Sequence, residues 1–153
     1  MRGAGHGFRW ESLRLTSLGF AAHVALYRLL KGRLVGRNIL IITTTGRRTM
    51  RGRSTPLFYV SDENDYVVIA SNGGEDRYPG WWHNIQANPD VEIEVGATRL
   101  RCRAHRIGEQ ADKEQLFERL TAVYGGYPKY RQGTARELTL FRLSKRAVAP
   151  GTG

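Results

Sequence analysis

The chain has 153 residues, of which 41% are hydrophobic and 25% charged, a balance typical of a globular protein with one core. Its formal net charge of +10 favours an anionic partner, which could be nucleic acid, a membrane surface or a small polyanion. Cys102 is the single cysteine, so a disulfide framework is excluded and a reducing, cytoplasmic compartment is expected.

The first segments are rich in glycine and arginine. Residues 1–11 are expected to be disordered, and residues 12–35 are predicted to form a basic amphipathic helix. Its uncharged stretch is too short to span a bilayer, but such a helix could lie on the inner face of the cell membrane as a peripheral contact. Packing against the main domain or against a second subunit is the alternative interpretation.

The stretch Ile39–Pro56 reads ILIITTTGRRTMRGRSTP and organises the chain that follows. An apolar strand, predicted over Asn38–Thr45, ends at Gly46, and four arginines follow before a second predicted strand, Thr55–Ser61. Guanidinium groups bind phosphates and carboxylates through paired hydrogen bonds. The loop is therefore interpreted as a binding site for a multiply charged anion, with an ordinary solvated hairpin tip as the alternative.

Further strands and a short helix come next. Tyr66–Ser71 is a nearly continuous apolar run, so this strand is expected to be buried on both faces. The sequence WWHNIQANP predicts a short helix that ends before Pro89. Val91–Val95 and Thr98–Ile107 flank Gly96-Ala97, and a hairpin loop of two residues fixes their register.

That register places Glu94 opposite Arg99, Glu92 opposite Arg101, and Val91 opposite Cys102. Two arginines of the basic run thereby gain acidic partners, which weakens the case for a nucleic-acid surface. Cys102 falls on the apolar face, which favours a buried structural thiol over a nucleophile.

The C-terminal part is predicted to contain a helix over Glu109–Tyr124, a strand over Glu137–Leu143, and a loose tail over residues 147–153. Six strands with hairpin connections and peripheral helices indicate a mainly β, α+β protein. Its expected core is a six-stranded antiparallel barrel that forms one domain over residues 36–146.

Familiar catalytic machinery is missing from the sequence. The histidines are scattered, so no metal site is expected, and no nucleophile motif or carboxylate pair is present. An enzyme of this kind would need a cofactor to supply the reactivity. Tyr124, Tyr127 and Tyr130 recur every three residues, so they could stack on a planar ligand and donate a hydrogen bond, or they could form a packing edge.

Three segments resemble motifs of the deazaflavin-dependent nitroreductase family. These are TTTGRRTMRGRSTPLFYV, ASNGGEDRYPGWWHNIQANPDVEIEV and YGGYPKYRQGTARELTLFRL, and the resemblance covers about residues 36–145. It implies a split β-barrel of the FMN-binding-like type and the cofactor coenzyme F-420, a deazaflavin with a phosphate and an oligoglutamate tail. Such barrels often pair as dimers, so a homodimer is one expectation.

The resemblance implies a role for each matching position. The cofactor would be bound by Arg48, Thr49, Met50, Ser54, Thr55, Pro56, Leu57, Ala70, Ser71, Asn72, Gly73, Trp81, Trp82, His83, Asn84 and Ile85. The acceptor substrate would be bound by Tyr59, Asn72, Tyr124 and Tyr130, and Tyr127 is predicted to be the catalytic residue. Gly125 and Gly126 replace bulkier residues of the family, which suggests a looser lid.

The leading hypothesis is therefore an oxidoreductase that transfers a hydride from reduced coenzyme F-420 to a quinone, an enone or a nitroaromatic compound. A non-catalytic carrier of the same cofactor and an FMN-dependent enzyme on the same barrel are alternatives. A nucleic-acid-binding protein is a remote alternative that rests on charge alone, because no recognition motif is present, so no nucleic-acid partner is expected.

Overall fold

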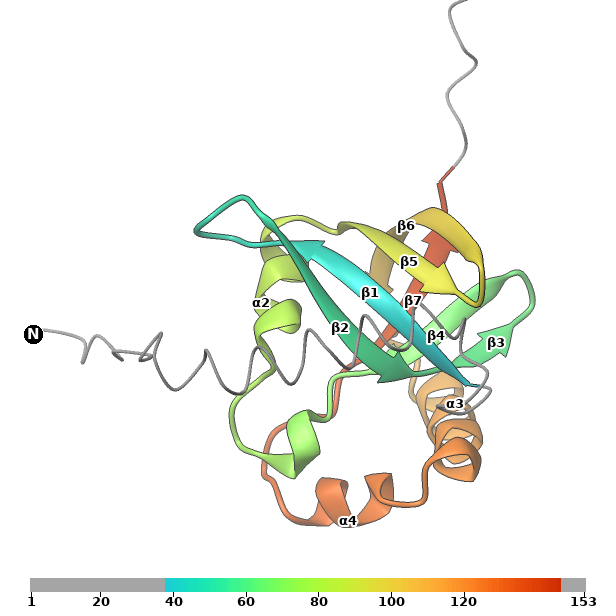
Figure 1. Ribbon diagram of the computed structural model, residues 1–153. Coiled ribbons are helices and arrows are strands. Elements are labelled where there is room, and N and C mark those ends of the chain that lie inside the picture. The colour runs from blue at the N-terminus through green and yellow to red at the C-terminus, as the bar shows by residue number, and fades with distance from the viewer. Residues whose placement is uncertain (1–37, 147–153) are drawn as a thin grey trace, which may run out of the picture.

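The computed structural model describes residues 38–146. The predictions for residues 1–37, including the basic helix over residues 12–35, and for the tail over residues 147–153 lie outside this range. The described residues form a curled antiparallel sheet of seven strands in the order β2-β1-β5-β6-β7-β4-β3, which Figure 1 shows wrapped into a half-barrel.

The strands take up most of the described chain. They are β1 Ile39–Thr45, β2 Gly52–Phe58, β3 Val60–Asp62, β4 Asp65–Ile69, β5 Asp90–Val95, β6 Thr98–Arg106 and β7 Leu140–Lys145. The helices are the short 3-10 turn η1 Asn72–Gly74, then α2 Gly80–Ala87, α3 Gln110–Val123 and α4 Tyr127–Gln132. Within residues 38–146, no helix combines the length and the apolar character needed to cross a bilayer.

The expectation of six strands is wrong by one, because the run predicted as Thr55–Ser61 breaks at Tyr59. Up to Phe58 this run pairs with β1, and from Val60 onward it pairs with β4. At the break, the Tyr59 N–H donates to the Asn38 carbonyl oxygen at 2.9 Å. One continuous apolar run therefore serves two different neighbours, which a pattern of alternating residues does not reveal.

The last strand also begins later than predicted, at Leu140 instead of Glu137. The residue before it, Thr139, is fully buried, and its carbonyl oxygen accepts a hydrogen bond from the Ala70 N–H at 2.8 Å. Arg136 and Glu137 use their side chains in polar contacts with other segments. The segment over residues 136–139 is thus an irregular connection held by side chains.

The core has two parts, one on each face of β4. Val68 belongs to the cluster enclosed by the curled sheet and closed by Trp81 and Ile85 of α2. Val67 and Ile69 belong to the second cluster, which α3 and α4 cover. The burial of β4 on both faces, predicted from its apolar run, is confirmed.

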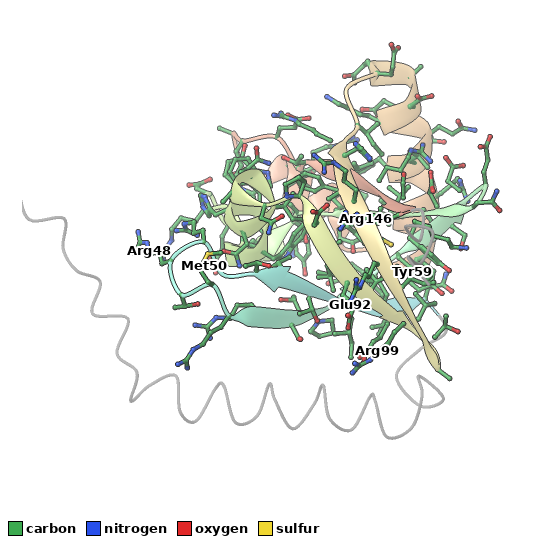
Figure 2. The ribbon with its side chains drawn as sticks, turned by 90° about the horizontal axis from the view of Figure 1, so that it is seen from above. Arg48, Met50, Tyr59, Glu92, Arg99 and Arg146 are labelled. Carbon is green, nitrogen blue, oxygen red and sulfur yellow. The ribbon has the colours of Figure 1, made fainter. Side chains whose placement is uncertain are left out.

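The hairpin β5–β6 has the predicted register, with Glu94 opposite Arg99 and Val91 opposite Cys102. Arg99 forms an ion pair with Glu94 at 2.8 Å and a longer one with Glu92 at 3.8 Å, as Figure 2 illustrates for Arg99 and Glu92. Glu92 lies opposite Arg101 as expected, but its ion pair is diagonal. Cys102 is fully buried on the apolar side, in agreement with the structural role expected of it.

Candidate functional site

The arginine loop between β1 and β2 is a tight, closed turn. The Gly46 N–H donates to the Arg51 carbonyl oxygen at 2.7 Å, and the Met50 N–H donates to the Gly46 carbonyl oxygen at 2.8 Å. A Cβ atom at position 46 would lie 2.6 Å from Thr49 Oγ1 and 3.1 Å from the Arg51 oxygen, so only glycine fits there. Met50 has a φ of 59°, and its side chain is 73% exposed.

Four arginines are exposed here, Arg47, Arg48 and Arg51 in the loop and Arg53 in β2, which begins at Gly52 and not at Thr55 as predicted. Figure 2 shows Arg48 and Met50 at the tip of the loop. None of the ion pairs formed among residues 38–146 involves Arg47, Arg48, Arg51 or Arg53. Their charge is therefore not neutralised by the carboxylates of the described fold. The loop fits a ligand that carries several negative charges, as a phosphate followed by carboxylates does.

Asn84 fixes the base of this loop to helix α2. Its Oδ1 accepts from the Arg47 N–H at 3.1 Å, and its Nδ2 donates to Thr44 Oγ1 at 3.0 Å. A backbone N–H can only donate, so it determines which way the amide points. The neighbouring His83 has a lowered pKa because of burial and, secondarily, the positive charge of Arg47, so at neutral pH its ring is largely uncharged.

Strand β2 continues from the loop, and its predicted cofactor residues lie in order beside β1. Ser54 faces Thr43, and the two hydroxyl oxygens are 2.8 Å apart. Thr55 and Pro56 pair with Ile42 and Ile41, while Leu57 packs against the enclosed core. Ser54 therefore stands nearest the loop as a polar group, whereas Leu57 contributes mainly to packing.

The turn that follows β4 has an unusual backbone. Asn72, Gly73 and Gly74 all have positive φ angles of 45°, 64° and 81°, a region that favours glycine and costs a non-glycine residue free energy. The Asn72 side chain donates to the Arg77 carbonyl oxygen at 2.9 Å. A Cβ atom on Gly74 would lie 2.9 Å from Tyr130 Cα, so this glycine allows α4 to pack directly on the turn.

The three predicted tyrosines form one cluster. The ring centroids of Tyr124 and Tyr127 are 5.1 Å apart, and those of Tyr127 and Tyr130 are 6.3 Å apart. The hydroxyl oxygens of Tyr124 and Tyr130 are 2.5 Å apart, within hydrogen-bonding distance. Phe58 stacks on Tyr124 with a centroid distance of 5.0 Å, so the cluster is tied to the end of β2.

Tyr127 is the most buried of the three, with only 4% of its surface exposed. Burial raises its pKa, and the neighbouring phenols of Tyr124 and Tyr130 raise it further. The Tyr127 hydroxyl is therefore a neutral group at physiological pH. In that state it can donate a hydrogen bond but does not act as a base.

The missing side chain of Gly126 makes room for the Tyr124 ring. A Cβ atom at this position would lie 2.6–2.7 Å from atoms of the Tyr124 ring and its hydroxyl oxygen. The Tyr124 ring occupies the space that a side chain would need, and from there it reaches Tyr130. The looser lid expected from Gly125 and Gly126 stays a prediction: the Tyr124 ring fills the space beside Gly126, whereas Gly125 has open space around it.

The structure buries the side chains of several predicted site residues, whose assignment to the cofactor or the acceptor stays a prediction. Trp81, Ile85 and Ala70 are buried in the enclosed core, so only their backbone groups could face a ligand. Tyr59 packs edge-on against Tyr66 with centroids 5.5 Å apart, and Figure 2 shows it far along β2 from Arg48. Phe58, not Tyr59, contacts the tyrosine cluster.

Sequence reasoning missed Tyr78 and Arg136. Tyr78 stacks on Trp82 with centroids 4.0 Å apart and planes 17° apart, and the Arg136 guanidinium carbon lies 4.7 Å from the Tyr78 ring centroid. Trp82 donates from Nε1 to Thr139 Oγ1 at 3.2 Å. Both residues stand inside the matched motifs, but no residue pattern reveals that Arg136 lies over a ring that is distant from it in sequence.

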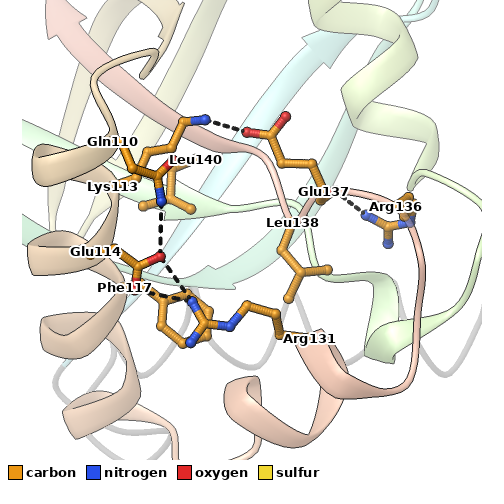
Figure 3. A pocket seen from close by; sticks show the side chains of 9 residues that line it. All are labelled: Gln110, Lys113, Glu114, Phe117, Arg131, Arg136, Glu137, Leu138 and Leu140. Atoms are coloured by element: carbon orange, nitrogen blue, oxygen red, sulfur yellow. Dashed lines mark hydrogen bonds and ion pairs between the residues drawn. The ribbon is translucent and has the colours of Figure 1, made fainter.

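A hollow of about 140 Å³ lies beside these segments, and Figure 3 shows the nine residues that line it, from Gln110 to Leu140. Its cations are already engaged: Lys113 pairs with Glu137 at 2.8 Å, Arg131 pairs with Glu114 at 3.3 Å, and Arg136 donates to backbone carbonyl oxygens. A hollow whose cations already have partners is a poor anion site. The arginine loop is thus the stronger candidate for binding an anion.

Comparisons with known proteins identify the family of this chain. The family model described as F420H(2)-dependent quinone reductase matches residues 20–145. An F420H(2)-dependent quinone reductase of Mycobacterium tuberculosis is 36% identical over 146 residues, which cover 90% of this chain and 97% of that protein.

Solved structures of related proteins have a similar fold. The F420-H2 dependent reductase FDR-A superposes with a TM-score of 0.65 at 29% identity, covering 71% of this chain and 96% of that one. A chain described as a domain-swapped dimer gives a TM-score of 0.66 at 27% identity and covers 84% of this chain and 98% of its own. The split-barrel fold and the family resemblance predicted from the motifs are both confirmed, and the chain belongs to the F420H(2)-dependent quinone reductase family.

Proposed function

We propose that this chain is an oxidoreductase that binds coenzyme F-420 across the arginine loop, helix α2 and the turn after β4, and reduces a quinone-type acceptor beside the tyrosine cluster. The observation that carries this proposal is a continuous series of contacts. Arg47 is bonded to Asn84 of α2, Trp82 of α2 stacks on Tyr78, and Gly74 of the turn packs on Tyr130.

These residues would bind different parts of the coenzyme, according to their chemistry. Arg48, with Arg47, Arg51 and Arg53 beside it, would hold the phosphate and carboxylates of the tail, and Ser54 would add a hydroxyl donor. The backbone of Ala70–Gly73 would lie against the deazaflavin ring. The Trp82 N–H already donates to the Pro79 carbonyl oxygen at 3.0 Å, so the N–H groups of Gly80 and Trp81 at the start of α2 would face an anionic group.

When bound, reduced coenzyme F-420 supplies the hydride. The chain's own residues would orient the acceptor, exclude water and stabilise the charge that develops on the acceptor oxygen. Tyr127 is the proposed hydrogen-bond donor to that oxygen, because its raised pKa keeps the phenol protonated at neutral pH. Tyr124 and Tyr130, joined through their hydroxyls, would form the wall of the acceptor site.

The test replaces one hydroxyl at a time. Tyr127→Phe is expected to lower the rate of quinone reduction by about a hundredfold to a thousandfold, the range for removing one transition-state hydrogen-bond donor, with coenzyme affinity nearly unchanged. Tyr66→Phe is the matched control, because Tyr66 contacts Tyr59 in the enclosed core. Equal turnover in both variants would remove Tyr127 from the proposed role.

The alternatives make different predictions. A non-catalytic carrier would bind coenzyme F-420 but reduce no quinone, enone or nitroaromatic compound under single-turnover conditions. An FMN-dependent enzyme would bind FMN in preference to the deazaflavin. The first outcome removes the activity and keeps the site, whereas the second keeps the barrel and changes the chemistry.

We also propose, from the sequence of residues 12–35, that a basic amphipathic helix gives the protein peripheral contact with anionic membranes, where a lipid-soluble quinone would be available. Co-sedimentation with anionic liposomes should then be stronger for the full chain than for a form that lacks residues 1–32. Equal co-sedimentation contradicts this proposal.

A homodimer is proposed separately, and its support is the solved neighbour described as a domain-swapped dimer. Sedimentation velocity of the full chain measures the mass directly. A species of twice the chain mass of 17.3 kDa supports the dimer, and a single monomeric species rejects it.

A further inference from the structure

We propose that Arg136 is a positioning residue of the active site, because its guanidinium holds the backbone turn against which the deazaflavin ring would lie. This inference rests on the proposed function, although its structural part can be tested without any ligand. Arg136 is half-buried and stands in the irregular segment before β7, at the edge of the hollow shown in Figure 3.

The side chain binds the turn at three carbonyl oxygens. Its Nη1 donates to Ala70 at 3.0 Å, its Nη2 to Ser71 at 2.8 Å, and its Nε to Glu75 at 2.8 Å. Nη1 also donates to the carbonyl oxygen of the adjacent Glu137 at 3.0 Å. All three nitrogens of the planar fork are therefore used, and the three carbonyls of the turn bracket Asn72, Gly73 and Gly74.

This turn requires external support. Gly73 and Gly74 adopt positive φ angles without steric cost, but Asn72 has a φ of 45°, a left-handed conformation that costs a residue with a side chain free energy and that its surroundings must stabilise. Its carbonyl oxygens also need donors. A second contact reinforces the first, because Thr134 Oγ1 donates to Asp76 Oδ1 at 2.8 Å.

The same guanidinium supports the aromatic side of the site. It lies over the Tyr78 ring at 4.7 Å, and Tyr78 stacks on Trp82 of α2. Arg136 therefore joins the turn to the stacked pair Tyr78–Trp82, and the turn itself contacts the tyrosine cluster through Gly74 and Tyr130.

Lysine at position 136 cannot make the hydrogen bonds that Arg136 makes. A single ammonium group has three donors at one point, whereas the guanidinium spreads its donors over a rigid plane that reaches carbonyls on different residues. Arg136→Lys should therefore retain the charge and lose the geometry. A shift of about 1 Å between reacting groups can lower a rate on the order of a hundredfold.

The first experiment is hydrogen exchange on the ligand-free full chain. In Arg136→Lys, the amides of residues 70–78 should exchange at least about tenfold faster than in the wild type, while those of β5 and β6 stay unchanged. The matched control is Arg119→Lys: Arg119 also donates to a backbone carbonyl, that of Ser61, and pairs with Asp62 at 3.1 Å, but it binds a different turn. Unchanged exchange over residues 70–78, or the same increase in both variants, overturns the proposal.

The second experiment is kinetic. Arg136→Lys should lower kcat for quinone reduction by about tenfold to a hundredfold, with little change in the dissociation constant of coenzyme F-420, because the arginine loop is intact. Arg119→Lys should leave both quantities near the wild-type values. A loss of affinity that equals the loss of kcat contradicts a positioning role. If the wild type reduces no quinone, the proposed function fails, and the exchange experiment still decides whether Arg136 holds the turn.

Discussion

Asn84 provides the sharpest test of how the arginine loop is held. Its amide makes two hydrogen bonds from a side chain that is only 7% exposed, one to the Arg47 N–H and one to the hydroxyl of Thr44, which is 1% exposed. Asn84→Ala removes both bonds and leaves a buried hydroxyl without its donor. Each bond contributes about 1 kcal/mol, and an unsatisfied buried group adds to the loss, so the free energy of unfolding should fall by about 2–3 kcal/mol.

Thermal denaturation should report this loss as a decrease in Tm of about 5–10 °C. The base of the loop would also lose its fixed position, so the arginines would have to be ordered on binding. We expect the affinity for coenzyme F-420 to fall about tenfold, which corresponds to the cost of ordering one or two side chains.

Two further variants measure how much the Asn84–Thr44 hydrogen bond contributes to stability and whether the effect is specific to Asn84. Thr44→Val removes the hydroxyl with little change in volume, and a double-mutant cycle with Asn84→Ala should give a coupling energy of about 1 kcal/mol. Asn88→Ala is the matched control at the end of the same helix, where the side chain makes one bond to the Asp90 N–H at 3.1 Å. Its Tm should fall less and its coenzyme affinity should stay unchanged. Equal effects of Asn84→Ala and Asn88→Ala on both measurements would refute this account of the loop.

Three further predictions concern packing and charge. Gly126→Ala should displace the Tyr124 ring and lower kcat more than coenzyme affinity, while Gly125→Ala, which has open space, should behave like the wild type in the same assay. Cys102, fully buried and with a pKa that burial raises to about 11, should react with a thiol reagent at neutral pH only after denaturant is added, and rapid labelling of the native protein would contradict its placement. Hydrogen bonds from Lys113 and then Arg106 lower the pKa of Glu137 below its ordinary value of 4.5. The ionised Glu137 side chain therefore stabilises the folded protein above pH 4.5, and this stabilisation disappears as the pH falls through the lower pKa of the folded state. Denaturant titrations should therefore find Glu137→Gln less stable than the wild type at neutral pH and equal to it in strong acid, and a difference that persists in acid would contradict the ion pairs.

The parts of the fold that depend on local sequence could be predicted well. A hairpin loop of two residues determines the register of β5 and β6 once its position is known, and the apolar run of β4 indicates burial on both faces. The break at Tyr59 could not be predicted, because it depends on which strand lies beside each half of the run. Pairing between distant strands is decided by the whole sheet.

In the candidate site too, features that depend on local sequence could be predicted, and contacts between distant segments could not. Exposed arginines after a strand indicate an anion-binding loop from sequence alone, and the spacing of the three tyrosines indicates a cluster. Arg136 gave no such signal, because its importance lies in carbonyl oxygens more than sixty positions away along the chain. At Gly126, sequence shows that a side chain is missing but not that a neighbouring ring fills the space.

The most direct test of the central claim is a fluorescence titration of the full chain with coenzyme F-420 and, in parallel, with FMN. We expect salt-sensitive binding of the deazaflavin, no comparable binding of FMN, and a loss of affinity in Arg48→Ala, because the exposed arginine loop would hold the anionic tail. Binding of FMN alone, or binding of the deazaflavin that is unaffected by Arg48→Ala and by salt, would contradict the role assigned to this loop.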